Sequence, residues 1–265
     1  MQTLNNSRSN PIKKVAQFHV SAGLRIFLSN KWKDHPIWVH FLGRQTIKHL
    51  IEAIGIPHVE IHHVITNGVI AGLADIVSDQ DQIYIYASQD VNNGSVDKTI
   101  PKEHLAPNFV LDNHLGKLTI YLRMLGFDCL YETNLTDPDL ATISANQDRI
   151  LLSRDRQLLM RKIVRRGYFV RSKQPFDQTV EIINRYHLSG KVKPFRRCLK
   201  CNYILIPVEK ASIQHRLEPK TQRYYDEFHI CACCDQIYWK GSHYEKMCRM
   251  IENLSSKSGK SSNDE

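Results

Sequence analysis

The sequence predicts a multi-domain protein of mixed α+β and α/β type. Three observations support this. The N-terminal part shows two strand-like runs followed by a helix and further strands, the middle alternates strands with helices, and two Cys-x-x-Cys pairs lie near the C-terminus. A length of 265 residues exceeds the usual size of one domain. We therefore expect an N-terminal α+β unit, a central α/β domain with a parallel sheet, and a C-terminal zinc-binding module.

The first predicted domain covers residues 15–88. VAQFHV and LRIFL have the composition of short strands, and Asn67-Gly68 between β-rich residues predicts a tight hairpin. QIYIYAS alternates like a half-buried strand. A helix is predicted before a stop at Gly55, because apolar residues recur at helical spacing at Ile47, Leu50, Ile51 and Ile54.

This order of elements resembles the ubiquitin-like β-grasp fold in its sulfur-carrier branch. Proteins of that branch act through a free C-terminal Gly-Gly, whereas this chain continues through SQDVNNGSVDKTIPKEHLAPN. A sulfur-carrier activity is therefore not expected, and the domain is predicted to dock, to stabilise, or to recruit a protein partner. Residues 89–107 are predicted to be a linker, and the polar segments 1–14 and 255–265 to be disordered tails.

The second predicted domain covers residues 108–194 and places acids where its elements meet. The apolar run Phe109 to Leu111 predicts a buried strand that ends at Asp112, followed by a helix that stops at Gly126. In the next segment Asp137 can cap a helix, with Asp139 in its first turn. ILLS at 150–153 then predicts a second strand, which runs into Asp155.

Acids at the carboxyl ends of parallel strands lie at the edge of the sheet where ligands bind. We therefore predict that Asp112, Asp137 or Asp139, and Asp155 are catalytic and hold Mg²⁺ or Mn²⁺, which prefer carboxylate oxygens and support hydrolysis of phosphodiesters. Taken singly, each acid is equally compatible with a helix cap or the end of a strand. The joint pattern favours a metal-dependent nuclease.

The net charge of +9 is concentrated in the middle of the chain. Residues 105–200 carry 17 basic and 9 acidic side chains, which favours RNA as the partner over a merely solvated basic face. The predicted RNA-binding residues are Lys117, Arg123, Arg154, Arg156, Arg161, Arg165 and Arg166.

The two Cys-x-x-Cys pairs have the spacing of zinc knuckles. Because four thiolates fill every corner of a tetrahedron, we expect a structural zinc rather than a catalytic one, at Cys198, Cys201, Cys231 and Cys234. Cys233 adjoins the second pair, but the spacing favours Cys234, while Cys129 and Cys248 are expected to be ordinary apolar residues. The chain has no apolar stretch for a membrane span and no secretory signal, so a cytoplasmic location is expected.

LDNHLGKLTIYLRMLGFDCLY, DPDLATISANQDRILLSRDRQLL and the paired cysteines resemble the ribonuclease domain at the C-terminus of the Mut-seven exonucleases. The resemblance implies a PIN-like α/β fold followed by a zinc ribbon at 195–250, and a sulfur-carrier-like domain often precedes it. It matches Asp112 to the first-strand acid, and Asp155 to the acid of a Thr-Arg-Asp-Arg motif in which Ser153 replaces the threonine. PIN nucleases usually have a fourth acid, for which Asp128 and Glu132 are the candidates here.

A metal-dependent ribonuclease is therefore the expected function. The alternative is a non-catalytic RNA-binding adaptor, which would use the basic face and the zinc ribbon for RNA and the β-grasp domain to recruit a partner. His243 lies in a segment that resembles a recurrent stretch of the family, and is expected to make a structural hydrogen bond or to contact RNA or a metal.

Overall fold

The computed structural model describes residues 13–32, 35–87, 107–241, 244–245, 248–249 and 252–253. The chain divides into two compact units, Met1–Ile100 and Pro101–Glu265. His243 lies outside the described residues, as do the predicted linker except Pro107 and the predicted tails except the start of the first strand.

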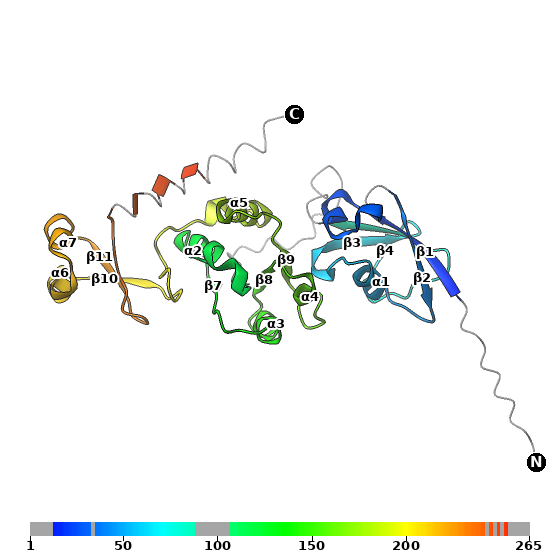
Figure 1. Ribbon diagram of the computed structural model, residues 1–265, viewed down its shortest axis with the longest axis horizontal. Helices are drawn as coiled ribbons and strands as arrows, with labels where there is room; N and C mark the ends of the chain where they lie inside the picture. The colour runs from blue at the N-terminus through cyan, green and yellow to red at the C-terminus, as the bar shows by residue number, and fades with distance from the viewer. Residues whose placement is uncertain are drawn as a thin grey trace, which may run out of the picture. The chain divides into compact units, whose positions relative to one another are not determined.

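The first unit is a mixed five-stranded sheet with one α-helix, drawn in blue to cyan in Figure 1. The strands run in the order β2-β1-β5-β3-β4, and the central pair β1 and β5 is parallel while the other pairs are antiparallel. Helix α1 begins after Thr46, whose side chain accepts a hydrogen bond from the backbone N–H of His49. The strands and the helix are β1 (Lys13–Val20), β2 (Ile37–Leu42), α1 (Ile47–Ala53), β3 (Ile61–Thr66), β4 (Val69–Ala71) and β5 (Gln82–Ala87).

Most of the elements predicted for this unit are present. Asn67 and Gly68 both have positive φ, as a tight hairpin between β3 and β4 requires. The prediction of a strand at LRIFL was wrong, because Ala22–Phe27 form a 3-10 helix that buries Leu24 and Phe27 three residues apart. The second strand is instead IWVHFL, and β1 begins at Lys13, inside the segment predicted to be a tail.

The second unit begins with a four-stranded, fully parallel sheet in the order β7-β6-β8-β9. Helices α2 and α5 pack together over one face, and α3 and α4 lie against the other (Figure 1). The apolar core between α2, α5 and the sheet includes Phe109, Leu118 and Ile182. The elements are β6 (Phe109–Leu111), α2 (Gly116–Met124), β7 (Cys129–Leu130), α3 (Asp137–Asn146), β8 (Ile150–Ser153), α4 (Arg156–Leu159), β9 (Gly167–Phe169) and α5 (Pro175–Arg185).

The predicted parallel sheet is thus confirmed, with one local correction. The cap of α3 is Thr136 rather than Asp137: the Thr136 side chain accepts from the backbone N–H of Asp139, and the Asp139 carboxylate accepts from the backbone N–H of Thr136. Asp137 is the first residue inside the helix. Gly126 ends the α2 region with a φ of 93°, as its predicted role as a cap requires.

The second unit ends in a small antiparallel sheet, β10-β11-β12. The long segment between the cysteine pairs is a hairpin with a helical insertion, because two short α-helices and a 3-10 helix at Gln214–Arg216 separate β10 from β11. Ile213 and Leu217 of this insertion pack against Phe228. The elements are β10 (Leu205–Val208), α6 (Lys210–Ile213), α7 (Pro219–Tyr224), β11 (Phe228–Cys231) and β12 (Ile237–Trp239).

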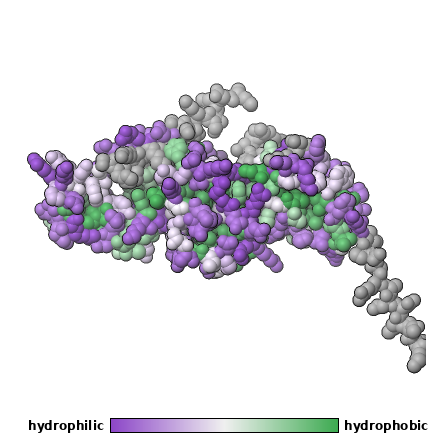
Figure 2. Space-filling view, viewed as in Figure 1, coloured by the Kyte–Doolittle hydropathy of each residue, from purple (hydrophilic) through white to green (hydrophobic). Residues whose placement is uncertain are grey.

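Hydrophilic residues cover much of the face in view in Figure 2, with hydrophobic residues in smaller patches between them. None of the helices in the described part of the chain is long and apolar enough to cross a membrane.

Candidate nuclease site and metal centre

Two of the predicted acids follow neighbouring strands at the carboxyl edge of the parallel sheet. Leu111, the last residue of β6, pairs with Leu152 in β8, so Asp112 and Ser153 are adjacent across the sheet. The chain leaves β6 toward β7 on one side, while β8 leads to β9 on the other. The strand order therefore reverses between β6 and β8, and α/β proteins bind their ligands at the carboxyl ends of strands at such a point.

Asp112 is the buried carboxylate of this edge, with an exposed fraction of 6%. Its Oδ2 accepts a 2.7 Å hydrogen bond from the Ser153 hydroxyl, and its Oδ1 accepts a 3.4 Å bond from the backbone N–H of His114. Within the described residues, no cationic side chain lies at ion-pair distance from it. Burying a carboxylate without a cation is costly, and the usual remedies are protonation or a metal ion.

Ser153 connects Asp112 to the second acid. Its Oγ accepts a 2.8 Å hydrogen bond from the backbone N–H of Asp155, while its hydroxyl donates to Asp112. Asp155 is exposed and caps α4, because its Oδ1 accepts from the backbone N–H of Gln157 at 2.7 Å. Ser153 is fully buried, so it can hold the two aspartates in a fixed relation.

The third predicted acid lies at the start of α3, which follows β7 and so begins near the same edge of the sheet. Asp139 is committed to the cap: hydrogen bonds from Thr136 lower the pKa of its carboxyl group. Asp137 is partly buried and does not take part in that cap. Between the two, Asp137 is therefore the freer candidate to hold a metal.

The aspartates do not form a closed metal site by themselves. In the part of the chain that the structure describes, the four cysteines are the only group of three or more ligand side chains whose donor atoms lie within 4.8 Å of one another. Ser153 therefore links the Asp112 carboxylate to the backbone N–H of Asp155, and within the described residues no group of three carboxylates forms around them.

Some of the predicted RNA-binding side chains are exposed, and others are engaged in contacts within the protein. Lys117, Arg161 and Arg165 are exposed. Arg154 donates to the carbonyls of Val170, Arg171 and Ser172. Arg166 pairs with Asp148 at 2.9 Å, and Arg156 lies 5.9 Å from the ring of Phe169.

Arg123 was predicted to bind RNA, and the structure contradicts this. It is only 4% exposed and donates to the carbonyls of Cys129, Leu199 and Lys200, so it joins β7 to the first cysteine knuckle. Burial lowers the pKa of its guanidinium group. Sequence reasoning missed this because an arginine on an amphipathic helix is usually exposed.

Asp128 is not the missing fourth acid. It precedes β7 at the amino end of the sheet, opposite to Asp112, and its carboxylate pairs with Arg149 at 2.6 Å and with Arg197 at 3.3 Å. Burial raises the pKa of this carboxyl group, but hydrogen bonds from Arg149 and Asn202 outweigh it and hold the pKa below its usual value. Glu132 is exposed, and within the described residues it forms no metal-ligand group with the other acids.

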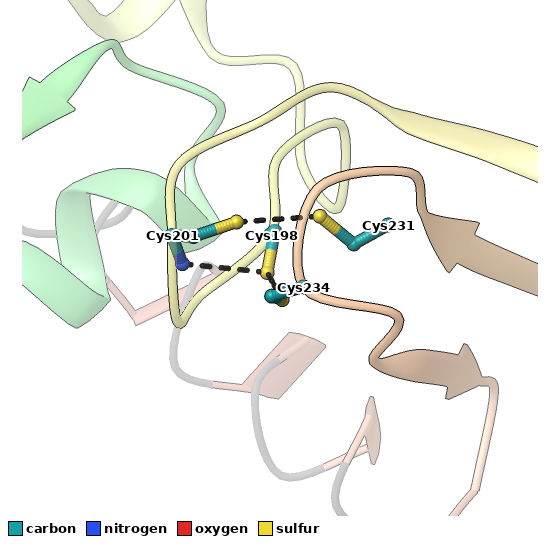
Figure 3. Close-up of side chains that lie close together, drawn as sticks. All are labelled: Cys198, Cys201, Cys231 and Cys234. Atoms are coloured by element: carbon teal, nitrogen blue, oxygen red, sulfur yellow. Dashed lines mark hydrogen bonds between the residues drawn. The ribbon is translucent and has the colours of Figure 1, made fainter.

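The four predicted zinc ligands converge (Figure 3). The Sγ atoms of Cys198 and Cys234 are 3.5 Å apart, and those of Cys201 and Cys231 are 3.3 Å apart. Sulfurs bound at 2.3 Å to one tetrahedral zinc would be roughly 3.8 Å apart, and the four sulfurs here all lie within 4.8 Å of one another, so the cluster could hold a metal such as zinc. Cys233 is exposed and lies outside the cluster, as the spacing predicted.

Tyr238 supports this cluster, and sequence reasoning missed it because only its position after the second knuckle could have indicated the role. Its hydroxyl makes hydrogen bonds with Cys198 Sγ at 3.1 Å and with the backbone N–H of Leu199 at 3.0 Å. Burial raises the pKa of the Cys198 thiol, but the hydrogen bonds from Tyr238 and from backbone N–H groups outweigh it and lower the pKa to about 6. Burial raises the pKa of the neighbouring Cys201 and Cys234 thiols, so the hydrogen bonds from Tyr238 and the backbone favour a thiolate at Cys198 in particular.

Comparison with known proteins agrees with this arrangement. The family model described as Mut7-C RNAse domain matches residues 107–251, more than half of the chain, and the model described as Mut7-C ubiquitin matches residues 13–92. No curated protein and no solved structure matches the chain.

Proposed function

The chain belongs to the Mut7-C RNAse domain family, with a ubiquitin-like domain before it, and from that premise we propose that it is a metal-dependent ribonuclease. In this proposal Asp112, Asp155 and Asp137 hold Mg²⁺ or Mn²⁺ at the carboxyl edge of a PIN-like sheet. The four cysteines of the zinc ribbon hold a structural zinc that does not take part in the reaction.

The observation that carries the proposal is the burial of Asp112 without a cationic partner among the described residues. Its two oxygens each accept a single hydrogen bond and retain lone pairs for another ligand. A divalent ion would compensate its charge, as Arg149 and Arg197 do for Asp128.

The proposal assigns a role to the metal ion, to Ser153 and to three exposed basic residues. When bound, Mg²⁺ or Mn²⁺ supplies an activated water and neutralises charge on the phosphoryl oxygens. Ser153 fixes the orientation of the Asp112 carboxylate, and the exposed residues Lys117, Arg161 and Arg165 are placed on surfaces where they can attract RNA phosphates.

The test is cleavage of labelled single-stranded and structured RNA by the full chain with Mn²⁺, Mg²⁺ or no added ion. We expect cleavage that requires the ion and is lost in Asp112→Asn and in Asp155→Asn. Asp148→Asn is the matched control, because Asp148 is exposed in the same domain and has a positive φ that asparagine tolerates well. Equal cleavage by the parent and Asp112→Asn, with zinc intact, would refute the proposal.

One observation favours a second candidate, a non-catalytic RNA-binding adaptor. The carboxylates of the described residues do not form a cluster of three within ligand distance of one another. In that case the basic face and the zinc ribbon would hold RNA, and the β-grasp domain would recruit a protein partner. Tight RNA binding with no cleavage under any ion condition would select this candidate.

The cytoplasmic location inferred from the sequence stays a prediction.

A further inference from the structure

The zinc-binding module contains a hollow lined by aromatic rings, away from the aspartates. Its volume is about 240 Å³, and the rings of Phe195, Tyr238, Trp239 and Tyr244 line it together with His229. Pockets for drug-sized ligands have volumes of roughly 300–1,000 Å³, so this one admits a single small planar group. Trp239 remains 38% exposed, which leaves ring surface open to such a group.

The rings are held by contacts within the module. The Tyr238 hydroxyl is fixed by Cys198 and Leu199 of the first knuckle, and the Phe195 ring lies 4.1 Å from that of Tyr244. A Cβ on Gly241 would lie 2.7 Å from Nε1 of Trp239, so the indole packs directly on this glycine. These contacts hold the rings against one another and against Gly241, and a site that needs little rearrangement costs less entropy to bind.

One wall of the hollow belongs to a basic segment of the chain. Pro194, Phe195, Arg197 and Leu199 contribute to the lining. No acidic residue occurs between Glu181 and Glu209. The same interval contains five basic residues from position 191 onward; Arg197 is paired with Asp128, while Lys193, Arg196 and Lys200 are exposed and Lys191 is partly buried.

Aromatic rings beside a run of cations form the combination that binds single-stranded nucleic acid, in which bases stack on rings while cations attract phosphates. We propose that this hollow binds one unpaired base of single-stranded RNA and that residues 191–200 attract the flanking phosphates. The inference rests on the proposed action on RNA and names its substrate class. An aromatic side chain of an acidic peptide is less favoured, because stacking on several rings suits a flat base.

The first test measures binding of labelled oligouridine, of an equally long abasic phosphodiester oligomer and of duplex RNA by fluorescence anisotropy. Full-length Asp112→Asn serves as the background, so that cleavage does not consume the probe. We expect oligouridine to bind best, and Trp239→Leu to weaken its binding roughly 5- to 100-fold, since one stacked base contributes about that factor. Tyr224→Leu, an exposed aromatic in α7 of the same module, should change affinity less than about 2-fold.

A second measurement avoids the risk that Trp239→Leu misfolds. In Trp32→Phe/Trp38→Phe the only tryptophan left is Trp239, and its fluorescence should be quenched by oligouridine but not by the abasic oligomer. Zinc content and the salt dependence of oligouridine binding should remain parental in Trp239→Leu, because the phosphate contacts are kept.

The inference fails if the abasic oligomer binds as tightly as oligouridine, or if an acidic, aromatic peptide quenches Trp239 and RNA does not. These outcomes are separable from the nuclease proposal. Cleavage with base-independent binding would overturn only the base pocket, whereas base-dependent binding without cleavage by the parent chain would overturn only the nuclease.

Discussion

Asp112 and Asp128 belong to the same parallel sheet, but they lie at its opposite ends and have different neighbours. The Asp128 side chain is 20% exposed and meets Arg149, Arg197 and Asn202, so its charge is compensated within the protein. Asp112 is more deeply buried and has a hydroxyl and one backbone N–H as partners. The first arrangement stabilises the fold, and the second leaves a charge that an added cation would satisfy.

The structural elements beside Asp128 also differ from those beside Asp112. On the Asp128 side, Arg123 and the Asn202 side chain bond to the backbone carbonyl and N–H of Cys129, which are the open hydrogen-bonding groups of the edge strand β7. The cysteine knuckle therefore covers an edge that would otherwise be unpaired. On the Asp112 side, Asp112 and Asp155 follow the carboxyl ends of β6 and β8. Cation-paired and cation-free aspartates thus lie at opposite ends of one sheet among the described residues.

Removal of zinc should give the largest effect, and it should be confined to the Asp128 side. Without metal the knuckle loses its main source of folding energy, so Asn202 and the Leu199 and Lys200 carbonyls no longer hold β7. We expect hydrogen-exchange protection of the Cys129 amide to fall by more than about 10³-fold, while the Asp112 amide, bonded to the Leu152 carbonyl, changes far less. Restored zinc should reverse the loss, and an unchanged Cys129 amide would contradict the coupling.

Asp112→Asn should lower ribonuclease activity by about 10³-fold, about 4 kcal/mol in the activation free energy. The free energy of unfolding should stay the same or rise by about 1 kcal/mol, because the buried charge disappears and the shape is kept. Single-turnover RNA cleavage and urea unfolding measure the two quantities. A large loss of stability would mean that Asp112 is structural, as Asp128 is.

Arg123→Met should lower the free energy of unfolding by about 3 kcal/mol. The substitution keeps much of the buried side-chain volume but leaves the carbonyls of Cys129, Leu199 and Lys200 without their donor. Lys117→Met on the same helix is the control, and since Lys117 is exposed its effect should be within about 0.5 kcal/mol. Equal urea midpoints for the two variants would show that Arg123 does not join β7 to the knuckle.

Asp128→Asn should have the smallest effect, a loss of about 2 kcal/mol near neutral pH, because it removes the partner of two arginines. The folded protein holds the pKa of Asp128 below its usual value. The stabilisation from the ionised carboxylate is therefore complete above the pKa of the unfolded chain, about 3.9, and it disappears as the pH falls through the lower pKa of the folded protein. The difference in unfolding free energy between parent and variant should therefore shrink below about pH 4. A difference that is independent of pH would exclude the charge as its origin.

The sequence by itself determined the features that depend on local spacing. Cys-x-x-Cys pairs identify four ligands because each pair needs only one tight turn, and Asn67-Gly68 identifies the hairpin because few residues tolerate positive φ. The apolar runs at 109–111 and 150–153 identified two strands of the parallel sheet and so placed Asp112 and Asp155 after neighbouring strands.

Only the tertiary structure decided which charged groups are satisfied. Arg123 and Lys117 look alike in the sequence, yet one bonds to carbonyls 76 and 77 residues away while the other is exposed. Asp128 and Asp112 likewise differ through partners from distant segments, Arg197 for one and Ser153 for the other. The free energy of a buried charge depends on all the groups around it, and those groups are assembled only when the chain folds.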